Sequence, residues 1–188
     1  LLIFTKQQQG ITGLEFFNID PKGMVCLDAG ASTGGFTDVL LQRGAKLVYA
    51  VDVGKNQLHE KLKADHRVKN MEGINLRHAN ASLLPEPVDL VVCDASFITL
   101  TLLLGPMLSM MKPEGRMLVL IKPQFELTPK EVGKGVVHDE ALRQKAIDKV
   151  VGFAREELGL ECLGVEPSKV KGPKGNQEYL ACFVRRGT

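Results

Sequence analysis

The sequence lacks the features that mark membrane, secreted and zinc-binding proteins. Its longest apolar stretch, residues 97–111, is interrupted by polar residues, glycine and proline, so it cannot span a bilayer. No charged-then-apolar leader is present, and the histidines show no ligand spacing with the cysteines, so we expect no metal site. The four cysteines stand singly, without C-x-x-C spacing, which favours buried free thiols in a reducing, cytoplasmic compartment. They are Cys26, Cys93, Cys162 and Cys182.

The composition fits one globular domain. The chain has 188 residues, of which 44% are hydrophobic and 24% charged. Its opening residues show no clear period, so we expect an irregular segment or linker over 1–16, a folded domain over 17–188, and a longer natural protein. The net charge of +2 conceals a basic cluster near the C-terminal end. A phosphate-bearing partner and a solvated basic face explain this cluster about equally well. It comprises Lys169, Lys171, Lys174, Arg185 and Arg186.

Short apolar runs alternate with segments of helical spacing along most of the chain. Strands are predicted at 25–29, 47–51, 68–71, 88–93, 117–121, 160–165 and 179–184, and helices at 35–43, 56–63, 98–111 and 140–158. The nearly continuous apolarity of several runs predicts strands buried on both faces of a parallel sheet. The last two strands are too close for a helical crossover and predict an antiparallel hairpin at a sheet edge. The fold class is therefore α/β, with a seven-stranded, mostly parallel sheet.

The stretch LDAGASTGGFTDVL, residues 27–40, places a glycine-rich loop between the first predicted strand and the first predicted helix. In a doubly wound sheet this turn usually forms part of the ligand site. Gly30, Gly34 and Gly35 would let the backbone approach a ligand closely. The spacing departs from the dinucleotide fingerprint GxGxxG, and no GK[ST] of a Walker loop follows.

Acidic and basic residues follow several of the predicted strands. Asp52 could accept both hydroxyls of a ribose, and together with Asp28 it indicates an adenosyl ligand, although either could be an ordinary strand-end carboxylate. Asp94 and Lys122 should project into one crevice from neighbouring strands. Lysine is rarely fully buried, so Lys122 points to a site rather than to the core. A structural Asp94–Lys122 ion pair is the simpler alternative.

Several motifs in combination resemble one known family. They are DAGASTGGFTDVLLQRGA at 28–45, VDVG at 51–54, VDLVVCDASFITL at 88–100, LVLIKPQFE at 118–126 and GNQEYLACF at 175–183. These motifs are similar to those of the haemolysin A-like (TlyA) branch of the FtsJ-like RNA ribose methyltransferases. The resemblance covers nearly the whole chain. It implies a Rossmann-like class I methyltransferase fold, S-adenosyl-L-methionine as cofactor, and methyl transfer to the 2'-hydroxyl of cytidines in ribosomal RNA or ribosomal subunits.

The resemblance also implies site residues. Asp94, Lys122 and Glu178 match three members of a Lys-Asp-Lys-Glu catalytic set. Lys122 would act as base, with a lowered pKa, or as electrostatic stabiliser, and Glu178 would sit on the edge strand. The first lysine is unassigned, because Lys6 is about three residues off register when the chain is aligned back from Phe16. The cofactor-binding set is Asp28, Gly30, Ser32, Gly34, Gly35, Phe36, Asp52, Asn75 and Asp94.

Other functions remain open at this point. A Rossmann-type nucleotide-dependent oxidoreductase is the alternative enzyme, and a non-enzymatic membrane-active haemolysin is a third option. Adenine methylation favours an Asn-Pro-Pro turn where this chain has Asp94-Ala-Ser-Phe, and cytosine C5 methylation needs a Pro-Cys pair that the sequence lacks. Family members usually carry an N-terminal S4-type RNA-binding module, which we expect to help with RNA recognition.

Overall fold

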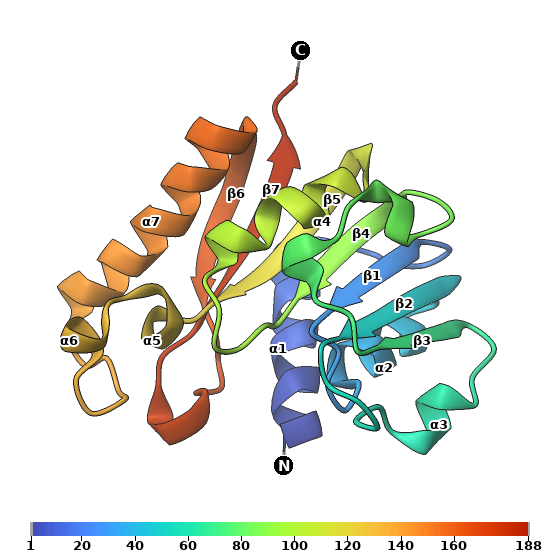
Figure 1. Cartoon of the computed structure of the whole chain (residues 1–188), viewed down its shortest axis with the longest axis horizontal. Coiled ribbons are helices and arrows are strands. Elements are labelled where there is room, and N and C mark those ends of the chain that lie inside the picture. The colour runs from blue at the N-terminus through green and yellow to red at the C-terminus, as the bar shows by residue number, and fades with distance from the viewer. Residues whose placement is uncertain (1, 188) are drawn as a thin grey trace.

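Seven strands form one sheet in the order β3-β2-β1-β4-β5-β7-β6 (Figure 1). The computed structural model describes residues 2–187, and side chains from residue 4 onward. The strands are β1 Val25–Ala29, β2 Leu47–Asp52, β3 Val68–Glu72, β4 Val88–Cys93, β5 Met111–Ile121, β6 Leu160–Pro167 and β7 Tyr179–Arg185. The first five are parallel, and β7 runs antiparallel to both β5 and β6. The predicted α/β fold with an antiparallel C-terminal pair is confirmed.

Helices cover both faces of the sheet and bury two apolar cores (Figure 1). One face carries α1 Leu2–Phe16, α2 Gly35–Gln42 and α3 Glu60–Lys63. The other carries α4 Leu104–Ser109 and α7 Glu140–Leu158. The short helices α5 Pro123–Glu126 and α6 Pro129–Val132 follow β5. Two predicted helices are shorter than expected: 56–63 contracts to α3, and 98–111 gives way to a 3-10 turn and α4, because Met111 already pairs with Val88 in the sheet.

The expectation of an irregular segment over residues 1–16 is wrong, because residues 2–16 form helix α1. The face that α1 buries is mostly polar or glycine, including Lys6, Gln9 and Thr12, so the helix has no apolar period to detect. Gly10 and Gly13 let it lie close to the domain. A Cβ at Gly13 would be 2.8 Å from Leu118, a core residue of β5. Helix α1 is therefore held against the sheet by close packing at its glycines, and not by an apolar face of its own.

Within residues 2–187, no helix combines the length and the apolarity needed to cross a membrane. Three of the four cysteines are buried, Cys162 is partly buried, and all four are free thiols.

Candidate active site

The carboxyl ends of the parallel strands open into a cavity of about 640 Å³. Gly30 after β1, Asp52 at the end of β2, Asp94 after β4 and Lys122 after β5 all line it. Helix α1 closes one side with Lys6 and Gln9, and Glu178 enters immediately before β7. The site therefore lies where ligands bind in open α/β sheets.

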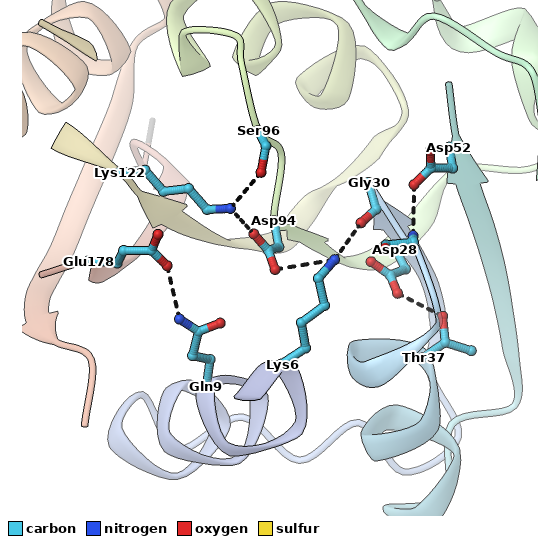
Figure 2. A network of polar contacts seen from close by, with 11 residues as sticks. Lys6, Gln9, Asp28, Gly30, Thr37, Asp52, Asp94, Ser96, Lys122 and Glu178 are labelled. Carbon is cyan, nitrogen blue, oxygen red and sulfur yellow. Dashed lines mark hydrogen bonds and ion pairs between the residues drawn. The ribbon is translucent and has the colours of Figure 1, made fainter. Parts of the chain in front are cut away.

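Asp94 lies at the centre of this site between two lysines (Figure 2). The Lys6 ammonium is 3.3 Å from Oδ2 of Asp94 and donates to the carbonyl of Gly30 at 3.1 Å. The Lys122 ammonium forms an ion pair with Oδ1 of Asp94 and donates to Oγ of Ser96 at 3.1 Å. All three charged side chains are at least nine-tenths buried, with exposures of 10% for Lys6, 8% for Lys122 and 4% for Asp94.

The charges in this cluster support one another. Burial disfavours the carboxylate of Asp94, but the ammonium groups of Lys6 and Lys122 outweigh it and hold the pKa of Asp94 below its usual value. Burial likewise disfavours the Lys122 ammonium, but the carboxylates of Asp94 and Glu178 outweigh it and raise the pKa of Lys122. The lowered pKa that the role of base would require is therefore not found for Lys122 in the free protein, whereas a raised pKa suits the alternative role of electrostatic stabiliser.

Glu178 is buried and held by two side-chain amides. Nε2 of Gln9 donates to Oε1 of Glu178 at 3.0 Å, and Nε2 of Gln124 donates to Oε2 at 3.0 Å. A Cβ at Gly172 would collide with the same carboxylate, so the neighbouring loop approaches Glu178 through glycine. Burial raises the pKa of Glu178. The expected edge position is incorrect, because Glu178 precedes β7, which lies between β5 and β6.

The glycine-rich loop divides into positions that face the cavity and positions that face the core. Gly30 lines the cavity with φ of +79°, and a Cβ there would be 2.5 Å from the backbone oxygen of Asp94. Gly34 also has positive φ, but a Cβ on it would collide with Leu62 and Leu58 in the core. Phe36 is buried in the same core, and Gly35 begins α2.

Asp28 lies beneath the loop rather than in the cavity. It is buried, and its Oδ2 accepts a hydrogen bond from Oγ1 of Thr37 at 2.7 Å (Figure 2). Burial raises the pKa of Asp28 to about 6. Asp28 does not line the cavity, and its hydrogen bond with Thr37 joins β1 to α2 across the glycine-rich loop.

Asp52 presents a carboxylate that the backbone orients. The amide of Ser32 donates to Oδ2 of Asp52 at 2.7 Å, and the amide of Gly54 donates to Oδ1 at 2.8 Å. Asn75 lines the same end of the cavity. Of the predicted cofactor set, Gly30, Ser32, Asp52, Asn75 and Asp94 therefore line the cavity, whereas Asp28, Gly34, Gly35 and Phe36 do not.

Sequence reasoning missed several residues at this site. Gln9 and Gln124 hold Glu178, and Lys6 contacts Asp94, although Lys6 had no assigned role. Phe97 also lines the cavity, with 90% of its surface exposed and a positive φ of 63°. A large apolar side chain exposed in a strained backbone conformation is a structural signal of function that the sequence alone does not give.

The predicted basic cluster is not a single surface. Lys169, Lys171 and Lys174 lie in the loop before β7, at the cavity end of the sheet, whereas Arg185 ends β7 at the opposite end. The Arg185 guanidinium donates to the carbonyls of Leu108, Met111 and Lys112, so it stabilises the fold.

A Rossmann-like sheet with Asp52 at the end of β2, and with Asp94 and Lys122 after β4 and β5, has the architecture of the class I methyltransferases. The FtsJ-like methyltransferase family model matches residues 11–185. This chain therefore belongs to the FtsJ-like methyltransferase family, and the predicted resemblance is confirmed.

Individual relatives agree with this assignment. The 16S/23S rRNA (cytidine-2'-O)-methyltransferase TlyA of Mycobacterium tuberculosis is 45% identical over 171 residues, which cover 90% of this chain and 63% of the relative. A hemolysin structure from Lactococcus lactis is 41% identical with a TM-score of 0.93, covering 97% of this chain and 88% of that one. The magnesium protoporphyrin IX methyltransferase of Synechocystis shares the fold, with 19% identity and a TM-score of 0.64. The match covers 97% of this chain and 81% of the Synechocystis chain. The chain thus spans less than two thirds of the length of the mycobacterial relative.

Proposed function

We propose that this chain transfers a methyl group from S-adenosyl-L-methionine to the 2'-hydroxyl of cytidine in ribosomal RNA. The observation that carries the proposal is the cluster of Lys6, Asp94 and Lys122, with Glu178 beside it, at one end of a cavity whose other end presents Asp52. The names of the relatives supply the expected substrate. Because ribosomal RNA is the substrate, the protein would work in the cytoplasm.

The cavity residues fit the proposed cofactor. Gly30 lines the cavity without a side chain, so its backbone can lie close to a ligand. Asp52 is already oriented by two backbone amides and keeps acceptor capacity for ribose hydroxyls. Ser32 and Asn75 line the same end of the cavity, and Asp94 offers a carboxylate near its centre. When bound, the cofactor supplies an activated methyl group on a sulfonium.

The chain's own residues must align the acceptor hydroxyl and remove its proton, because a 2'-hydroxyl is a poor nucleophile at neutral pH. Lys122 is cationic, so its role is to hydrogen-bond the 2'-oxygen and stabilise the negative charge that develops there. Asp94 keeps Lys122 charged and fixes its position through their ion pair.

Glu178 is the proposed acceptor of the 2'-hydroxyl proton. Its raised pKa makes it a stronger base than an ordinary glutamate, while the amides of Gln9 and Gln124 favour the ionised form needed for acceptance. Lys6 takes the role of the first lysine of the catalytic set by neutralising Asp94 from the opposite side. An S4-type module in the natural protein stays a prediction from the family resemblance.

Calorimetric titration with S-adenosyl-L-methionine and, separately, with NADH tests the cofactor. Binding of NADH alone would overturn the proposal in favour of an oxidoreductase. Tritiated methyl transfer to ribosomal RNA, followed by alkaline hydrolysis, then tests the acceptor, because a 2'-O-methyl group protects the adjacent phosphodiester. Lys122→Ala should keep cofactor binding and lose transfer by roughly a hundredfold or more. Methylation confined to bases would contradict the ribose assignment.

A further inference from the structure

Three exposed lysines surround the loops beside Glu178. Lys171 and Lys174 lie between β6 and β7, and Lys134 lies in the loop between α6 and α7. We call these three residues the lysine rim. Among the side chains described from residue 4 to 187, those of the rim form no ion pair, and the same is true of exposed lysines far from the cavity, such as Lys22, Lys46 and Lys69. The rim therefore carries positive charge that the protein itself does not neutralise.

A buried asparagine joins the two loops that carry the rim. Asn176 is 3% exposed; its Oδ1 accepts from the amide of Val137 at 3.0 Å, and its Nδ2 donates to the carbonyls of Gly135 at 2.9 Å and Pro173 at 3.2 Å. A Cβ at Gly135 would be 3.2 Å from Nζ of Lys174, so the Lys174 side chain already reaches the neighbouring loop. The rim thus rests on a fixed base.

The rim borders one half of the cavity. Gly172 and Pro173, between Lys171 and Lys174, line the cavity wall next to Glu178. Asp52 and Asn75 belong to the end formed by β2 and the segment after β3, on the other side of β1 and β4. Figure 1 shows the β6–β7 loop and the α6–α7 loop at the same end of the sheet, where the parallel strands finish. The rim is therefore placed for the methyl acceptor rather than for the cofactor.

We propose that the lysine rim binds the phosphate backbone of a single-stranded segment of RNA and directs a nucleotide into the Glu178 end of the cavity. This inference rests on the proposed function for the identity of the partner. Lysines bind phosphate as point charges and carry no sequence information, so the rim would give affinity and direction, not base choice. Its unneutralised charge and its base of two loops joined by Asn176 suit a flexible polyanion that must approach from one side.

The test compares two triple variants with the same change in charge. Lys134→Gln, Lys171→Gln and Lys174→Gln together remove the rim. Lys22→Gln, Lys46→Gln and Lys69→Gln remove three exposed lysines that precede or begin β1, β2 and β3, at the opposite end of the sheet. The probe is a fluorescein-labelled, cytidine-containing single-stranded oligoribonucleotide, with anisotropy measured over a series of salt concentrations. Calorimetry with S-adenosyl-L-methionine reports whether the cavity is intact.

The rim variant should bind the RNA roughly tenfold or more weakly and lose up to about two units of salt slope, at roughly 0.7 for each phosphate contact on a single strand. The control variant should keep the wild-type slope, and both should bind the cofactor like wild type. If both variants lose RNA affinity equally, or if the rim variant loses none, the rim is not an RNA-binding surface. Equally tight binding of polyglutamate would overturn RNA as its partner in favour of an acidic protein. RNA binding that depends on the rim, without methyl transfer, would instead contradict the proposed function and leave the rim proposal intact.

Discussion

The hydrogen bond from Gln9 to Glu178 gives a quantitative test of the proposed mechanism. Gln9→Leu removes the 3.0 Å bond from Nε2 to Oε1 in a buried setting and leaves only the amide of Gln124 on the carboxylate. A hydrogen bond to a charged group contributes about 1.5–3 kcal/mol, and one pKa unit corresponds to about 1.4 kcal/mol. The pKa of Glu178, already raised by burial, should therefore rise by roughly one to two further units.

The sign of the effect on activity follows from the ionised form. Glu178 must be a carboxylate to accept a proton, so the rate of methyl transfer increases as pH rises through its pKa. In a plot of the single-turnover rate against pH, the acidic limb should therefore move to higher pH in Gln9→Leu. The maximal rate on the plateau should change less. Gln9→Lys should move it back to lower pH, because a cation favours the carboxylate.

A matched control lies on the same helix. Nε2 of Gln7 donates to Asp38, away from Glu178, so Gln7→Leu makes the same chemical change without touching the site. It should leave the acidic limb where wild type has it. An unchanged limb in Gln9→Leu, or an equal shift in Gln7→Leu, would show that Gln9 does not control the ionisation of Glu178.

Two further substitutions test the site. Arginine keeps its proton and cannot act as a base. If Lys122 works as a cation, Lys122→Arg should therefore retain at least about tenfold more methyl transfer than Lys122→Ala. If both variants bind the cofactor and are equally inactive, Lys122 is the base. Gly30→Ala combines positive φ with a clash against the Asp94 backbone, and should lower the free energy of unfolding by about 2–5 kcal/mol and abolish cofactor binding. Gly23→Ala, with φ of +74° and no atom within 4 Å, should cost only about 1–2 kcal/mol in urea unfolding; similar losses in both variants would mean that the clash does not matter.

Sequence patterns predicted the sheet better than they predicted the site. Runs such as 88–93 are apolar throughout, and burial on both faces of a parallel sheet leaves little choice of structure. The glycine loop was located correctly, but its glycines serve different purposes. Gly30 faces the cavity, whereas Gly34 avoids a collision with Leu58 and Leu62, and no local spacing distinguishes these two cases. Contacts such as Gln124 to Glu178 join residues 54 positions apart, so local pattern cannot find them.

Helix α1 shows how Lys6 reaches Asp94 although Lys6 is out of register with the first lysine that the resemblance implies. Aligned back from Phe16, Lys6 is about three residues off the register that the resemblance implies for the first lysine, and Gln9 stands three residues further along the helix. Residues three apart lie on the same face of a helix, so a shift of three moves a side chain by about one turn and keeps its direction. Lys6, with its long side chain, reaches Asp94 from that earlier turn, and Gln9 binds Glu178. One helix thus supplies a cation to one carboxylate and an amide to the other, and the two lysines balance the two carboxylates at the centre of the site. The unpaired positive charge of the lysine rim lies beside this balanced site, where an RNA backbone would meet it.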